Sequence, residues 1–221
     1  PFLYESMGFE PDKDLAPISI VAGTGYVLLA GNRYKGKTLQ EILAAARAAS
    51  NPLAMGVAST TAHVLYGMLS DATGVAFVRV PYAAGNRTLF TDLMRDDLDL
   101  VIEAMPSAMA PIANGQVSAV AVTNPVRTSF LPTVPTFKES GVAIELIGWN
   151  AFYLPRGAPA DVVATLNRAS NEALKDAELR RRFATVASEP IGGTPDDLAN
   201  LIRVDRSRYE PMIRRLGLKA Q

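Results

Sequence analysis

The chain has 221 residues, with 22 basic and 22 acidic side chains, one histidine and no cysteine. The balanced charge argues against a nucleic-acid-binding surface, because such surfaces need an excess of lysine and arginine. The absence of cysteine excludes disulfides, thiolate zinc sites and cysteine nucleophiles. A single histidine cannot build a multi-histidine metal site, and no metal or cofactor site is expected.

No apolar run reaches the roughly 20 residues that a membrane-spanning helix needs, so no membrane span is expected. The length suits one large domain or two modest ones. The first residue is Pro1 and not a methionine, so a segment upstream of it is expected to have been removed.

Short apolar runs alternate with amphipathic stretches along the first 124 residues, and Gly, Pro or Asn separate them. Strands are expected at residues 18–30, 53–58, 75–80, 98–103 and 117–123. Helices are expected at residues 38–49, 59–73, 86–94 and 106–115. This order predicts an α/β fold with parallel-type sheets flanked by helices, because buried parallel strands read as continuous apolar runs.

The pattern changes after residue 124, where three prolines form a stiff connection that indicates a domain boundary. A strand is expected at residues 145–154 and helices at 159–175 and 176–186. Thr194-Pro195-Asp196-Asp197 has the cap, proline and carboxylates that open a last helix.

Three predicted loops carry the residues that suit a ligand, and each lies between a strand and a helix. The carboxyl ends of parallel strands share one edge of the sheet, where open α/β folds bind their ligands. The loops contain Ser59, Thr60 and Thr61; Tyr82, Ala84 and Gly85; and Glu103, Ala104 and Ser107.

Each of these loops also has an alternative interpretation. The hydroxyls of residues 59–61 are preferred helix caps, although the amides of a helix N-terminus also suit a carboxylate. The loop around Tyr82 could be an ordinary turn, and Glu103 could be a solvated rim carboxylate. His63, in the first turn of its helix, is more typical of a structural histidine than of a catalyst, and Trp149 is more typical of a core residue than of a binding platform.

Several motifs spread over the chain make the sequence similar to the solute-binding receptors of the tripartite tricarboxylate transporters, the Bug family. They are Val80-Pro81-Tyr82, Met105-Pro106-Ser107-Ala108, Leu131-Pro132-Thr133-Val134-Pro135-Thr136-Phe137, Leu154-Pro155-Arg156-Gly157-Ala158-Pro159 and Gly192-Gly193-Thr194-Pro195. The resemblance implies a periplasmic-binding-protein-like fold of two lobes that close on a small carboxylate. It places residues 1–29 and 147–221 in lobe 1, which is incomplete, and residues 30–146 in lobe 2, the complete ligand-binding lobe.

The resemblance also implies roles for the residues of the three loops. Ser59, Thr60, Thr61 and Gly85 would donate hydrogen bonds to the ligand carboxylate. Tyr82, Ala84, Glu103, Ala104 and Ser107 would line the rest of the site, with His63 and Trp149 as further candidates.

The sequence departs from the family at two places. Two residues of the first loop are missing between Gly56 and His63, and the opening strand-helix segment with its Pro-Gly-Gly loop has no counterpart. The chain is therefore expected to be a fragment of a longer receptor.

The function that the resemblance implies is a periplasmic receptor without catalytic residues. It would be a monomer that captures a small organic acid and delivers it to the membrane permease subunits of a tripartite transporter. One alternative is the effector domain of a regulator, which uses the same fold. Another is a small α/β hydrolase, which the lack of a G-x-S-x-G motif disfavours.

Overall fold

The computed structural model describes residues 2–4, 7–83 and 88–219. Its internal contacts divide the chain into two compact units: unit 1 comprises residues 1–23 and 149–221, and unit 2 comprises residues 24–148. The chain passes from one unit to the other within two strands, β1 (Leu15–Ala30) and β6 (Ile147–Pro155). The lobe boundaries expected from the sequence fall after residues 29 and 146, and they stay a prediction.

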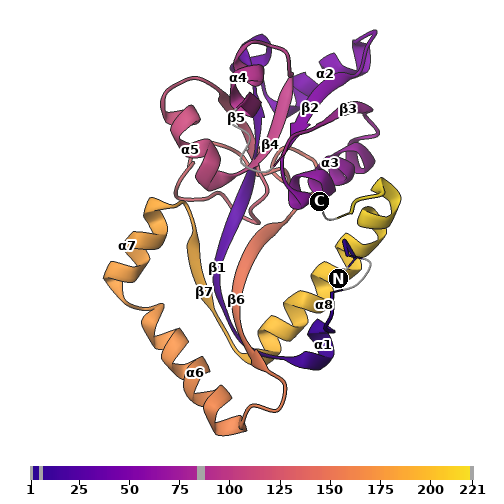
Figure 1. The fold of residues 1–221 in the computed structure, drawn as a ribbon. Helices are drawn as coiled ribbons and strands as arrows, with labels where there is room; N and C mark the ends of the chain where they lie inside the picture. The colour runs from indigo at the N-terminus through magenta and orange to yellow at the C-terminus, as the bar shows by residue number, and fades with distance from the viewer. Residues whose placement is uncertain (1, 5–6, 84–87, 220–221) are drawn as a thin grey trace. The chain divides into compact units, whose positions relative to one another are not determined.

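Unit 2 is built on a five-stranded sheet in the order β3-β2-β4-β1-β5. Its other strands are β2 (Leu53–Val57), β3 (Phe77–Pro81), β4 (Leu100–Ala104) and β5 (Ser118–Val122). Strand β2 is parallel to β3 and β4, whereas β1 is antiparallel to β4 and β5 (Figure 1). The α/β class is confirmed, but the sheet is mixed. The apolar run of β1 could not reveal its direction, because a strand buried on both faces has the same pattern in either orientation.

The helices of unit 2 are η1 (Asn32–Tyr34), α2 (Leu39–Ala48), α3 (Thr60–Thr73), α4 (Thr88–Met94) and α5 (Met105–Ala113). A capping box opens α2, since Thr38 and Glu41 exchange side-chain and backbone hydrogen bonds. Helix α3 lies against β2 and β4, and α4 and α5 contact β4. Helix α3 ends at Gly74, whose left-handed φ of 65° favours glycine.

Unit 1 contains the first part of β1, with β6 and β7 (Glu189–Gly192) paired to β1. Its helices are α1 (Pro11–Asp14), α6 (Ala160–Ala173), α7 (Ala177–Thr185) and α8 (Pro195–Leu216). The sequence predicted β6, α6, α7 and the start of α8, but it did not predict α1 or β7. Strand β7 contains Pro190 and ends at Gly192, which are residues typical of loops.

Two properties of the described residues bear on the possible functions. No helix among them combines the length and the apolar character needed to cross a bilayer. They also contain no cluster of three or more His, Asp or Glu side chains that could hold a metal ion.

Candidate functional site

The three predicted loops meet at one edge of the unit 2 sheet. Val57, the last residue of β2, pairs with Pro81 at the end of β3 and with Ile102 near the end of β4. Ala104 at the end of β4 lies opposite Tyr26 of β1. The expected convergence of the loops is therefore observed; that they bind a ligand stays a prediction.

The first loop leads into the N-terminus of α3 and leaves backbone donors unused. The Ser59 side chain caps the helix by accepting from the Ala62 amide at 3.1 Å, and the Ser59 carbonyl accepts from the His63 amide at 3.0 Å. In the part of the chain that the structure describes, the amides of Thr60 and Thr61 have no acceptor. Ser59 is thus a cap, as the alternative interpretation held, and the next two amides are available to an anion.

Helix α5 starts directly at the end of β4 in a similar way. Its N-cap residue, Ala104, has no side chain that can accept a hydrogen bond, and Pro106 has no N–H group. Because β2 and β4 are adjacent parallel strands, the positive ends of α3 and α5 open at neighbouring positions of the same edge.

Tyr82 is placed at this edge, but its hydroxyl is already occupied. The Tyr82 amide donates to the Val57 carbonyl, and its phenol donates to Asp92 Oδ2 at 2.6 Å. Burial and this hydrogen bond raise the pKa of Tyr82 to about 12, so the phenol keeps its proton. The neighbouring candidates Ala84 and Gly85 lie outside the described residues.

Glu103 is the one acidic residue in the five strands of unit 2, whose only other charged residue is Arg79 of β3. Its Oε1 accepts a hydrogen bond from the Ala104 amide at 2.7 Å. Burial raises the pKa of Glu103 above its usual range, and the Ala104 hydrogen bond acts in the opposite direction. The carboxylate is therefore held at the end of β4 at an electrostatic cost, which is common in functional sites.

His63 lies in the first turn of α3, next to Arg79. Burial, and secondly the positive charge of Arg79, lower the pKa of His63 below its usual value. Its Nδ1 is buried and has no hydrogen-bond partner in the described part of the molecule. The hydrogen-bonded structural role expected from the sequence is therefore not seen at this nitrogen.

Trp149, the other additional candidate, belongs to unit 1. Its indole Nε1 donates to Asp205 Oδ2 at 2.6 Å, and Asp205 is buried on α8. This bond gives Trp149 a structural partner within unit 1.

Asn124 is a candidate that the sequence interpretation missed. It follows the end of β5 at the same edge, is only 8% exposed, and its Oδ1 has no donor among the described residues. A Cβ on Gly25 of β1 would lie 1.8 Å from that oxygen, so the Asn124 side chain fits there only because residue 25 is a glycine. The position of an asparagine directly after an apolar strand was the available signal.

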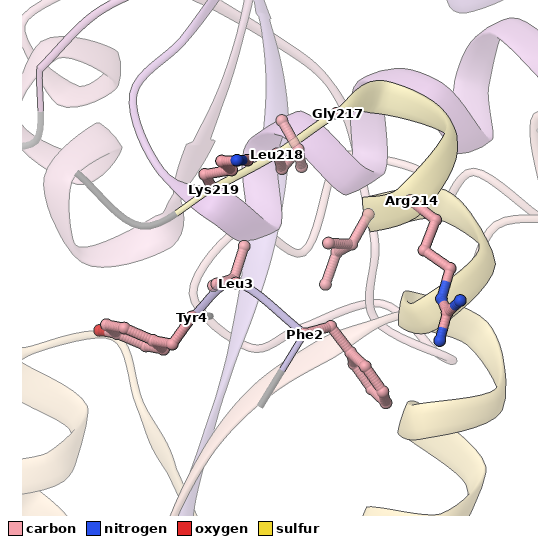
Figure 2. A pocket seen from close by; sticks show the side chains of 8 residues that line it. Phe2, Leu3, Tyr4, Arg214, Gly217, Leu218 and Lys219 are labelled. Atoms are coloured by element: carbon pink, nitrogen blue, oxygen red, sulfur yellow. The ribbon is translucent and has the colours of Figure 1, made fainter. Parts of the chain in front are cut away.

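A cavity of about 250 Å³ lies in unit 1, and none of the predicted ligand residues lines it. Figure 2 shows its walls, with Arg214 on α8 and Leu3 on the opening segment of the chain. The lining residues are Phe2, Leu3, Tyr4, Ile213, Arg214, Gly217, Leu218 and Lys219.

The chemistry that the unit 2 edge supports is anion binding. The unpaired amides of Thr60 and Thr61 and the positive ends of α3 and α5 suit carboxylate oxygens, and no described hydrogen bond joins the ring of His63 to a hydroxyl. A histidine-activated nucleophile, as the hydrolase alternative requires, is not present among the described side chains.

Comparisons with known proteins show the family of the chain. The family model described as "Tripartite tricarboxylate transporter family receptor" matches residues 1–218. The protein BugT of Bordetella pertussis is 28% identical over 98% of this chain and 67% of its own length. The chain spans about two thirds of the length of the curated relatives that it matches.

Solved structures of similar proteins include two that were solved with an organic acid. Rpa4515 of R. palustris, solved with adipate, has a TM-score of 0.82 and 25% identity, covering 98% of this chain and 73% of its own. MatC of Rhodopseudomonas palustris, solved with bound malate, has a TM-score of 0.74 and 25% identity, covering 96% of this chain and 74% of its own. The periplasmic-binding-protein-like fold is confirmed by these structures.

Proposed function

Because the chain belongs to the tripartite tricarboxylate transporter receptor family, we propose that it is a periplasmic receptor that captures a small organic carboxylate and delivers it to the membrane permease of a tripartite transporter. The observation that carries the proposal is the pair of helix N-termini, those of α3 and α5, at the ends of adjacent strands, with the Thr60 and Thr61 amides unpaired among the described residues. Two similar structures were solved with adipate and with malate, which supports the ligand class.

The physical basis is charge-assisted hydrogen bonding. The amides of Thr60 and Thr61, unpaired within the described residues, lie at a helix end that carries partial positive charge. A carboxylate accepts such bonds strongly, and each is worth about 1.5–3 kcal/mol. No covalent step is part of this role, so the proposed protein is a receptor and not an enzyme.

The sharpest test removes one amide while leaving the helix intact. Thr60 is the first helical residue of α3, where proline is favoured, and Ser59 before it is extended with φ −140° and ψ 159°, as a residue before proline should be. Thr60→Pro should fold normally and weaken carboxylate binding at least about tenfold, because one charge-assisted bond is lost.

Thr60→Ala is the matched control, since it removes the hydroxyl but keeps the amide. Isothermal titration calorimetry with adipate, malate and citrate gives the affinities, and thermal melts report folding. Equal affinity of Thr60→Pro and the unmodified protein for every acid that binds would contradict the proposed site. Absence of binding by the unmodified protein to any of a broad carboxylate panel would contradict the proposed function.

The remaining parts of the proposal have their own measurements. Periplasmic residence is tested by osmotic-shock release of the protein from its host, and delivery is tested by acid uptake in a strain that lacks it. Closure of the lobes on the ligand, which the sequence resemblance implies, stays a prediction that small-angle scattering with and without ligand measures.

A further inference from the structure

Two oxygen-bearing side chains, the half-buried Glu103 and the buried Asn124, flank β1 on one face of the unit 2 sheet. Glu103 lies opposite Val27 in the β1–β4 pair, and paired residues project from the same face. Gly25 is two residues before Val27 and therefore shares that face. The Asn124 oxygen occupies the space where a Gly25 side chain would begin, so Asn124 lies on the Glu103 face as well.

Both side chains have unused capacity to accept hydrogen bonds. Glu103 uses Oε1 for the Ala104 amide, and its Oε2 has no donor in the described part of the chain. Asn124 is more than nine-tenths buried, and its Oδ1 is without a donor among the same residues. A buried acceptor without a donor, such as the Asn124 oxygen, costs free energy, and the Glu103 carboxylate attracts donors by its charge, so a group that donates to both side chains would be favoured there.

The surroundings provide no described cation for Glu103. The elements packed against β4 that reach its end carry few titratable groups: β2, β5 and α5 have none, and the unit 2 part of β1 has only Tyr26. Helix α4 carries Asp92, which already accepts from Tyr82. Helix α3, which carries His63, Tyr66 and Asp71, lies on the opposite face of the sheet, where Arg79 stacks over the Tyr66 ring. The register of β3, β2 and β4 also places Arg79 on the face opposite Glu103.

We propose that Glu103 and Asn124 form a second subsite that selects carboxylic acids bearing a hydrogen-bond donor, a hydroxyl or an ammonium, over acids that place a second carboxylate there. This inference rests on the proposed function, in which the N-terminus of α3 holds the ligand's carboxylate beside the N-terminus of α5. A donor satisfies the free oxygens of Glu103 and Asn124. A second carboxylate would face the charge of Glu103 without a described counter-ion, and a site that repels one ligand class is specific in this way.

The test compares ligands of matched length that differ at one end. Succinate is compared with γ-hydroxybutyrate and γ-aminobutyrate, and adipate with ε-hydroxycaproate and ε-aminocaproate, by titration calorimetry near neutral pH. In at least one length series the donor-bearing acid should bind about tenfold or more tighter than the diacid. Glu103→Gln should reduce that ratio to within about threefold, since an amide neither repels a carboxylate nor attracts an ammonium as a charge does.

Controls separate the subsite from folding and from overall charge. Glu172→Gln removes the same charge from an exposed position on α6 and should leave the ratio unchanged. Glu103→Gln removes a buried charge and should melt no lower than the unmodified protein. Asn124→Ala, checked by circular dichroism, should also lower the preference for the donor-bearing acid.

The outcomes distinguish this inference from the function on which it rests. If diacids bind as tightly as their donor-bearing analogues, or if Glu103→Gln leaves the ratio unchanged, the subsite is wrong while the carboxylate receptor stands. If no carboxylate of either kind binds, the proposed function is wrong and the subsite with it.

Discussion

The two units of the molecule are stabilised in different ways. In unit 2, β2, β4 and the end of β1 are buried on both faces, and Leu28, Leu29, Met55 and Val101 have no exposed surface. In unit 1, neither α6 nor α7 contains a buried residue, and α8 buries only three residues over its 22. Polar contacts supplement the smaller apolar core of unit 1, such as the hydrogen bonds from Asn167 and Asn171 to the Gly193 carbonyl.

The two units also differ in whether their buried polar side chains have hydrogen-bond partners. All four described side chains with a buried, unpaired polar atom lie in unit 2: His63, Ser70, Arg79 and Asn124. The buried polar side chains of unit 1 have partners, as Asp205 has in Trp149. A densely packed unit can retain unpaired groups because its apolar core more than offsets their cost, and such groups tend to gather where a protein binds something.

The largest expected effect comes from removing core volume in unit 2. Leu28→Ala should lower the free energy of unfolding by about 2–5 kcal/mol, because Leu28 is fully buried and its loss leaves a cavity. The matched change in unit 1, Leu166→Ala, removes a side chain that is 39% exposed and should cost less than about 1 kcal/mol. Urea unfolding followed by circular dichroism measures both, and similar costs would remove the contrast between the units.

The next effect concerns the polar contacts of unit 1. Asn171 accepts from the Gly193 amide at 2.8 Å and donates to the Gly193 and Asn167 carbonyls. Gly193 has a φ of 116°, which only glycine adopts readily, so the asparagine holds an unusual turn. Asn171→Ala should cost about 2–3 kcal/mol, since it leaves the part-buried Gly193 amide unpaired and removes one of the donors to the Gly193 carbonyl.

Asn150→Ala, at an exposed position of β6 in the same unit, is the control and should change unfolding by less than about 0.5 kcal/mol. If Asn171→Ala is as mild as this control, unit 1 does not depend on its polar contacts.

A smaller effect is expected at the edge of the unit 2 sheet. Tyr82→Phe removes the hydrogen bond to Asp92 and should cost about 1–2 kcal/mol, because the acceptor is charged and part-buried. Tyr153→Phe in unit 1 removes a hydroxyl that has no partner among the described residues, so it should be nearly neutral. Thermal melts of the two variants side by side measure the difference, and equal shifts would contradict the role of the Tyr82–Asp92 pair.

Much of the fold could be predicted from the sequence, because its signals are local. The capping residues Thr38, Ser59 and Thr194 start their helices as expected, and the apolar runs mark the strands of unit 2. Strand β7 was missed because a four-residue edge strand with proline and glycine has no periodicity to detect. The antiparallel direction of β1 was missed because burial on both faces removes the alternation that could have indicated it.

The candidate site was predictable by position but not by detail. The rule that parallel strands end at one edge placed Thr60, Tyr82 and Glu103 together. It could not show that the Tyr82 hydroxyl is already bound to Asp92, because that contact depends on side-chain packing. Asn124 was missed for a similar reason: its role follows from register with Gly25, which lies 99 positions earlier in the chain.

The smallest expected effect is a pH dependence in unit 2. Burial and Arg79 lower the pKa of His63 in the folded state, so the unfolded chain takes up the proton first as the pH falls. Above about pH 6.5 the imidazole is neutral in both states and contributes no difference in stability. As the pH falls from there through the folded-state pKa, stability is lost, and His63→Gln should remove that part of the loss.

Because His63 is the only histidine, a single imidazole signal in the NMR spectrum reports its pKa directly. Arg79→Met should raise that pKa by removing the neighbouring positive charge, whereas Arg79→Lys should raise it less because the charge is kept. A His63 pKa at or above the ordinary value in the unmodified protein would show that this group is not destabilised by its surroundings. In that case, the polar side chains that destabilise unit 2 would be only those whose charge does not change near neutral pH.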